Sequence, residues 1–198
     1  MISRMIRHSA AATVLLAASA TAVFAAPRTY EIDPEHATIA FLVDHIGFAK
    51  VLGQFTETNG TFVFDEDTRT LGDVSVTVEA TKVFTNDDAR DRHVTGSDFL
   101  DAGSNPQITF KANGGTIKGD RTGTVTGDLT IRGVTKPITL DVTWNKSGKY
   151  PFGHGKHTIG VSARGSLLRS EYGMTYALGG IVGDEVELII EVEAIAQD

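Results

Sequence analysis

Ser97, His93 and Asp98 form the one local group in this chain whose residue types would suit nucleophilic catalysis. A hydrolase of that kind needs a nucleophile, a base that takes its proton and a third group that orients the base. Ser and Asp also form turns and caps through their short polar side chains, and the pattern Gly-x-Ser-x-Gly is absent. We therefore interpret the group as turn-forming and assign no catalytic residue. A small serine hydrolase using Ser97 and His93 stays as one alternative.

Two histidines, His154 and His157, stand three positions apart, which would suit two ligands of a metal ion. Zinc sites need three or four ligands held in place. The Gly-rich segment 151–157 is predicted to be a mobile loop, so we expect no functional metal and no cofactor. The chain has no Cys, which excludes disulfides, thiolate sites and Cys nucleophiles.

Paired carboxylates are the third group with chemical potential. The run 65–67 is Asp-Glu-Asp, and Asp87 and Asp88 precede a polar segment. Acids at turns and helix starts accept hydrogen bonds from free backbone N–H groups or stay solvated. The glutamates of segment 185–193 are predicted to form a wet strand face. None receives a catalytic role.

Residues 1–25 have the pattern of a secretory signal peptide. Arg4 and Arg7 give a basic start, and an uncharged run from Ser9 to Val23 follows. Ala25 then supplies the small residue that precedes a signal-peptide cleavage site. The run is shorter than the roughly 20 apolar residues of a membrane span. We predict cleavage after Ala25, a domain of residues 26–198, a periplasmic location and no stable membrane insertion.

The charge balance of the chain is acidic. It has 25 Asp and Glu against 18 Lys and Arg, and a net charge of −7. Two of its arginines lie in the predicted leader. A negatively charged protein is repelled by phosphate backbones, so we expect no nucleic-acid partner.

Most of the chain after the leader alternates apolar and polar residues with period two. Such alternation is typical of strands with one dry and one wet face, the pattern of antiparallel sheets. The segments that carry it are 39–43, 62–64, 74–80, 108–110, 125–131, 138–144, 159–163 and 186–192.

Turn residues and one polar segment divide these strands. The predicted turns are Asn59-Gly60, Asn113-Gly114-Gly115, Gly119-Asp120, Gly133, Ser147-Gly148 and Gly179-Gly180. The polar segment from Asn86 to Gly96 is predicted to hold a short helix capped by Asn86 or Asp87. About eight strands with short connections and one helix predict an all-β, eight-stranded antiparallel barrel, with a two-sheet sandwich as the alternative. From the residues alone, a core filled by the apolar side chains is favoured over a cavity that they line.

Four ordered motifs give the chain a family resemblance. The motifs are Tyr30-x-Ile32-Asp33-Pro34-x-His36, Arg92-His93-x-x-x-Ser97-Asp98-Phe99, Gly127-x-Leu129-Thr130-Ile131-Arg132-Gly133 and Arg169-Ser170-Glu171-Tyr172-Gly173-Met174. In their order and spacing the chain resembles the YceI-like family of polyisoprenoid-binding periplasmic proteins, from about Tyr30 to Ala194. It departs from the family at Ala37, at Leu100 and in the stretch 154–157.

The resemblance implies a lipocalin-like barrel whose tunnel holds a long isoprenoid lipid for storage or transport, without enzymatic activity. Fatty acids or fatty amides in the same tunnel are the alternative ligands, and a homodimer is left open. The residues expected to line the tunnel are Phe41, Val43, Phe62, Val76, Phe99, Phe110, Ile131, Leu140, Val142, Trp144 and Val161. The candidates for contact with a lipid head group are Asp33, His36, Arg132, Arg169 and Tyr172.

Overall fold

The computed structural model describes residues 26–197. The predicted leader, residues 1–25, lies outside the described residues. Within the described part, no helix is both long and apolar enough to cross a membrane.

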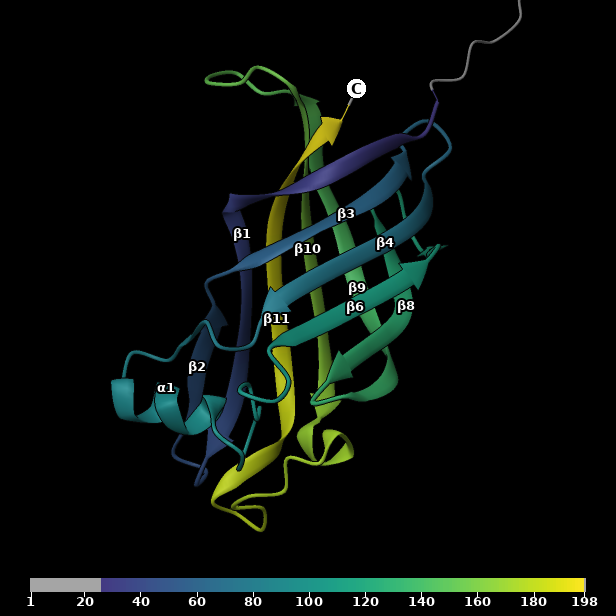
Figure 1. The fold of residues 1–198 in the computed structure, drawn as a ribbon. Coiled ribbons are helices and arrows are strands. Elements are labelled where there is room, and N and C mark those ends of the chain that lie inside the picture. The colour runs from purple at the N-terminus through teal and green to yellow at the C-terminus, as the bar shows by residue number, and fades with distance from the viewer. Residues whose placement is uncertain (1–25, 198) are drawn as a thin grey trace, which may run out of the picture.

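Eight antiparallel strands close into a barrel. Figure 1 shows how they are arranged. Each pairs with its neighbour in the order β11-β10-β9-β8-β6-β4-β3-β1, and β1 pairs again with β11 to complete the circle. This closure confirms the predicted barrel and excludes the sandwich. The strands are β1 (Arg28–His45), β3 (Thr58–Asp65), β4 (Thr70–Glu79), β6 (Gln107–Asn113), β8 (Thr122–Ile131), β9 (Val134–Lys149), β10 (His157–Leu168) and β11 (Val182–Gln197).

Shorter elements extend the barrel at its ends. The strand β2 (Ala49–Phe55) pairs with the second half of β1, β5 (Val83–Phe84) pairs with β2, and β7 (Thr116–Ile117) pairs with β8. The 3-10 helix η1 (Arg169–Tyr172) follows β10. These short strands were not predicted.

The helix α1 (Asp88–Thr95) confirms the polar-segment prediction. The Asp87 side chain accepts a 2.8 Å hydrogen bond from the Arg90 backbone N–H and so caps the first turn. We call the end of the barrel that carries α1 the α1 end, and the opposite end the far end.

Four of the predicted turns lie in connections between strands, and two are wrong. The hairpin between β8 and β9 turns at Arg132 and Gly133, whose φ angles of 51° and 73° have the signs of a type I′ turn. Asn59-Gly60 instead lies within β3, where a Cβ on Gly60 would stand 2.5 Å from the Ser75 carbonyl oxygen. Gly60 therefore allows a close approach of two strands. Ser147-Gly148 is continuous with β9, which pairs with β10 up to Lys149.

Candidate binding cavity

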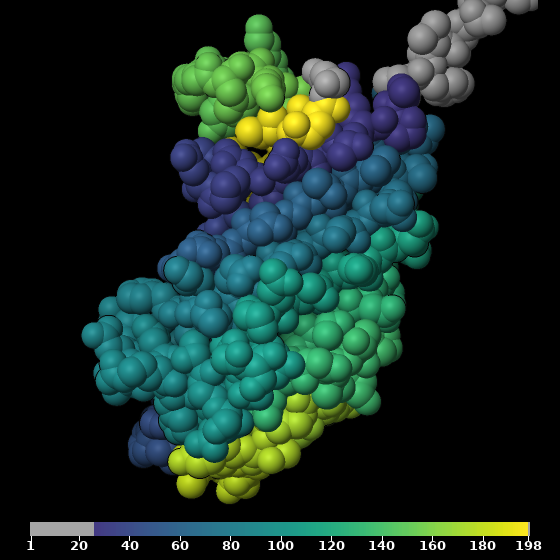
Figure 2. All heavy atoms as spheres, in the orientation of Figure 1, coloured from purple at the N-terminus to yellow at the C-terminus, as the bar shows by residue number. Residues whose placement is uncertain are grey.

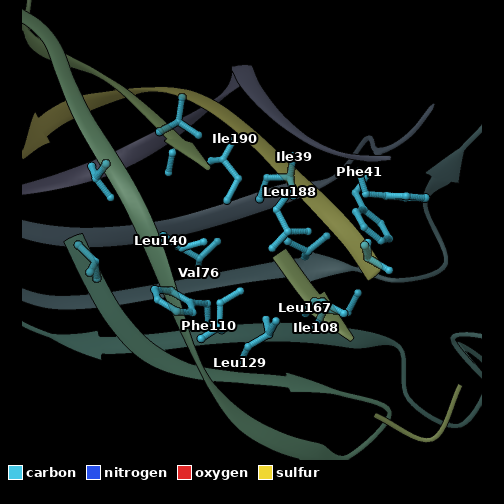
Figure 3. A pocket seen from close by; sticks show the side chains of 18 of the residues that line it. Ile39, Phe41, Val76, Ile108, Phe110, Leu129, Leu140, Leu167, Leu188 and Ile190 are labelled. Atoms are coloured by element: carbon cyan, nitrogen blue, oxygen red, sulfur yellow. The ribbon is translucent and has the colours of Figure 1, made fainter. Parts of the chain in front are cut away.

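A cavity of about 650 Å³ occupies the barrel interior, within the size range of small-molecule sites. All eight barrel strands contribute side chains to its wall. Figure 3 shows aliphatic and aromatic side chains pointing into it from several strands, among them Phe41, Phe110, Leu140, Leu188 and Ile190. The dry faces of the strands thus line a cavity inside the barrel.

Strand alternation is what aims these side chains inward. On β11, the apolar residues at 186, 188, 190 and 192 line the cavity, and none of the glutamates at 185, 187, 191 and 193 does so. On β10, Val161 lines the cavity and Ser162 bonds on the other face to Asn145. The irregularity near Gly160 is an extra residue in β9: Gly160 pairs with Lys146 and Val161 with Trp144, which leaves Asn145 unpaired in the ladder. The alternation of β10 itself is unbroken.

The structure brings together all eleven residues that were expected to line a tunnel. Each is part of the cavity wall. They are Phe41, Val43, Phe62, Val76, Phe99, Phe110, Ile131, Leu140, Val142, Trp144 and Val161. Their contact with a ligand stays a prediction.

The cavity runs along the barrel as a tunnel. Its lining on β11 extends from Val182 to Val192. Ten steps of about 3.4 Å span about 34 Å along the strand, or roughly 26 Å along the axis of a barrel whose strands tilt by about 40°. The lining includes His93 and Tyr176 at the α1 end and Arg69 and Arg121 at the far end. Polar side chains therefore flank a long apolar middle section.

Among the five head-group candidates, Arg169 is the one that lines the cavity. Its side chain is 2 % exposed. The guanidinium donates to the carbonyl oxygens of Met174 at 2.6 Å, Gly183 at 2.7 Å and Val182 at 2.9 Å. It also lies 5.6 Å from the Phe99 ring centroid. Burial lowers the pKa of Arg169, and nearby Asp184 opposes that shift. Arg169 thus fastens the loop after η1 to the start of β11 beside the tunnel.

The other four head-group candidates are not part of the cavity lining. Arg132 donates to the carbonyl oxygens of Phe99 at 2.8 Å and Gly173 at 3.3 Å. Tyr172 is buried, but its side chain is not part of the tunnel wall.

Asp33 and His36 form a pair in the bulge of β1. The ring nitrogen Nδ1 of His36 lies 2.8 Å from Oδ2 of Asp33, and the interaction raises the pKa of His36. The bulge interrupts the pairing with β11 between Ile32 and Ala37. The pair lies on the outer surface of the barrel, away from the lining.

The geometry around His93 does not assemble a nucleophile and a base. The nitrogen Nε2 of His93 lies 3.0 Å from Oδ2 of Asp98, and the ring packs edge-on against Phe99 and Tyr176. Ser97 is exposed, and no hydrogen bond joins it to His93 within residues 26–197. The group lies instead beside the tunnel opening, because His93 is part of the lining.

The prediction of a loop through His157 is wrong at that residue, because His157 begins β10 and pairs with Lys149. Its Nε2 lies 2.6 Å from Oε1 of Glu66. His154 stacks on Tyr150 with ring centroids 4.7 Å apart, so the two histidines have different neighbours. Across the described residues, no three His, Cys, Asp or Glu side chains converge as a metal site would require.

A polar network at the far end was missed by the sequence reasoning. The Glu66 carboxylate accepts hydrogen bonds from the Tyr30 hydroxyl at 2.5 Å and from Ser147, and it pairs with His157. Burial raises the pKa of Tyr30, and Glu66 adds to that rise. Burial alone would raise the pKa of Glu66, but the hydrogen bonds from Ser147, Tyr30 and His157 outweigh it and lower that pKa. No spacing pattern links these four positions.

Comparison with known proteins shows one family over nearly all of the described chain. The model of the YceI-like domain matches residues 30–194. A UPF0312 protein from Pseudomonas paraeruginosa is 36% identical over 195 residues, which cover 98% of this chain and all of the relative. The protein YceI from Escherichia coli is 39% identical over 170 residues, covering 85% of this chain and 87% of the relative.

Solved structures show the same fold. The YCEI protein of Campylobacter jejuni is 31% identical, with a TM-score of 0.71 over 78% of this chain and 90% of that one. A polyisoprenoid binding domain from Saccharophagus degradans shares the fold at a TM-score of 0.61 and 11% identity, covering 85% of this chain and 98% of the domain.

Proposed function

Because this chain belongs to the YceI-like domain family, we propose that it is a non-enzymatic binding protein for one long apolar lipid. The lipid would be a polyisoprenoid or an isoprenoid quinone, held in the barrel tunnel for storage or transport. The observation that carries the proposal is the tunnel itself, with an apolar wall built from all eight barrel strands. The polyisoprenoid binding domain of the same fold supports the choice of ligand.

The free energy of burying apolar surface explains how such a wall would bind a long lipid with few polar contacts. Each buried methylene contributes about 0.8 kcal/mol. A chain of a few dozen carbons therefore has enough driving force to approach the practical affinity limit of about −20 kcal/mol. Selectivity would come from the length and width of the tunnel and from the polar groups at its two ends.

The separation of Ser97 from His93 supports a binding role. The His93 ring is held between Asp98, Phe99 and Tyr176, and the Ser97 hydroxyl is apart from it. The proposal therefore assigns His93 to the wall of the tunnel opening.

Native mass spectrometry of the purified protein, followed by lipid extraction, tests this function. We expect a co-purifying lipid whose homologues differ by whole isoprene units. A fatty acyl mass would instead identify a fatty acid or fatty amide as the occupant. A barrel that stays empty after incubation with polyprenols, quinones and fatty acids would contradict a lipid-binding role.

We also propose that the protein acts in the periplasm after cleavage behind Ala25. The Arg4 and Arg7 start and the uncharged run up to Val23 support this location. The expected result is a mature N-terminus at Ala26 in the soluble fraction of the cell envelope. An intact Met1 on protein recovered from the membrane pellet would contradict it.

A further inference from the structure

Exposed apolar side chains gather at one end of the barrel. Ten large hydrophobic residues are exposed in the described chain, and eight of them lie at the α1 end, on loops, on the short strands β2 and β5 or at the last residue of β10. These eight are Ile46, Phe48, Leu52, Phe84, Leu168, Tyr176, Leu178 and Ile181. Large exposed apolar patches mark interaction surfaces, so this asymmetry needs a partner to explain it.

Two uncharged loops make up the tip of this patch. The turn 46–49 reads Ile-Gly-Phe-Ala, and residues 173–182 also carry no charged side chain. The Ile46 backbone N–H donates a 3.0 Å hydrogen bond to the Ile181 carbonyl oxygen, which joins the two loops into one surface. Phe48 stands at its tip and is 90 % exposed. We call the exposed residues Ile46, Phe48, Tyr176, Leu178 and Ile181 the apolar rim.

The apolar rim is continuous with the tunnel. Tyr176 and Ile181 belong to the tunnel lining, although they are 47 % and 54 % exposed. Each therefore contacts the cavity and also reaches the outer surface. A lipid tail leaving the tunnel past Tyr176 and Ile181 would pass from one apolar surface to another, while the charged residues of the lining at this end are Asp44, Arg90 and Arg169.

The turns of the far end carry charged side chains. The turn between β3 and β4 carries Glu66, Asp67 and Arg69, and the turn between β7 and β8 carries Lys118, Asp120 and Arg121. Removing such charges from water is costly. Figure 2 shows the 150–156 loop and the chain around residues 170–180 at opposite ends of the molecule. The uncharged loops of the rim therefore differ from these charged turns, although helix α1 beside the rim also carries Asp88, Arg90, Asp91 and Arg92.

From these features we propose that the apolar rim docks onto a phospholipid bilayer, with Phe48 and the 176–181 loop inserted among the lipids. The inference rests on the proposed function, because a bilayer is where a long apolar ligand would be collected or delivered. A second copy of the chain is the less suitable occupant, since it would cover the tunnel opening. Lys50 beside the rim is paired with Glu187, so docking would depend on apolar insertion and not on anionic head groups.

Flotation of the purified protein with phosphatidylcholine vesicles tests the docking. We expect the wild-type protein to float with the vesicles, and raised salt to leave binding unchanged. Phe48→Glu should weaken binding tenfold or more, the effect of losing one buried aromatic side chain. Phe48→Trp should retain binding and shift its emission to the blue when vesicles are added. Phe152→Glu is the matched control, since Phe152 is 73 % exposed but lies on the β9–β10 loop at the far end.

The outcomes separate this inference from the proposed function. Phe48 does not line the tunnel, so purified Phe48→Glu should take up a polyprenol supplied in detergent as well as the wild type does. A lipid-loaded wild type that does not float overturns the docking alone, and a floating protein that takes up no lipid overturns the proposed function. Equal loss of vesicle binding in Phe48→Glu and Phe152→Glu overturns the proposal that the α1 end faces the bilayer. A wild-type dimer that Phe48→Glu separates, with no flotation, identifies the rim as a self-association surface and overturns bilayer docking.

Discussion

The Tyr30 hydroxyl donates a 2.5 Å hydrogen bond to the Glu66 carboxylate and so joins the start of β1 to the turn after β3. Tyr30 has no exposed surface, and its ring stacks on Phe62 with centroids 5.4 Å apart. Because Glu66 also binds Ser147 of β9 and His157 of β10, one carboxylate ties together both sides of the closed barrel. The network stabilises the far end just outside the tunnel wall.

Removing the Tyr30 hydroxyl should destabilise the fold. Tyr30→Phe keeps the stacking on Phe62 but deletes a hydrogen bond to a charged group, which is worth about 1.5–3 kcal/mol. Urea denaturation of wild type and variant measures the loss in the free energy of unfolding. In a Glu66→Gln background the same substitution should cost less, because the charged acceptor is gone. Fully additive losses would show that the hydroxyl and the carboxylate do not interact.

The stability of the protein should fall in acid partly through Glu66. Its pKa is lowered in the folded state from the ordinary 4.5, so the unfolded chain takes up the proton first. The contribution is present above pH 4.5 and is lost as the pH falls through the folded-state pKa. Unfolding curves across this range should therefore fall more steeply for wild type than for Glu66→Gln. Parallel curves for the two proteins would rule out this role of Glu66.

Filling the tunnel should remove the lipid and leave the fold intact. Val161 lines the cavity, so the indole of Val161→Trp can occupy space that a ligand would use. We expect the variant to stay folded but empty in native mass spectrometry. In a barrel with no usable space, overpacking would cost about 1–3 kcal/mol of stability instead.

Ser162→Trp is the matched control for that experiment. Ser162 bonds to Asn145 at 2.8 Å and to Glu191 on the outer face. Its replacement should lower the melting temperature through the loss of these two hydrogen bonds but leave the lipid content unchanged. A variant Val161→Trp that unfolds, together with a wild type that contains no lipid, would contradict the carrier function.

Loss of the Ser97 hydroxyl should leave lipid binding unchanged. Ser97 is exposed, so Ser97→Ala removes a group that faces solvent. His93→Ala deletes part of the tunnel opening, and we expect it to stay folded with lipid occupancy near that of wild type. Assays with ester substrates provide the opposing test: hydrolysis by the wild type that either variant abolishes would support the hydrolase alternative.

The sequence alone determined the local features of the fold, because their signals lie a few residues apart. Period-two alternation placed Val161 inward and Ser162 outward, and Asp87 was among the two residues expected to cap the helix. The same local reading misinterpreted Gly60, because a glycine that lets Ser75 of the neighbouring strand approach looks like a turn residue in isolation. A local sequence pattern carries no information about which residue lies opposite it on the neighbouring strand.

Only the tertiary structure decided whether the interior was filled or hollow. Eight strands can enclose either a packed core or a ligand, and the pairing of β1 with β11 sets the closed circumference around the cavity. The tertiary structure also decided that Arg169 lines the tunnel while Arg132 does not. The contact of Tyr30 with Glu66 spans 36 positions, and that of Glu66 with His157 spans 91. Such contacts exist because barrel closure brings distant segments together, and no spacing within one segment encodes them.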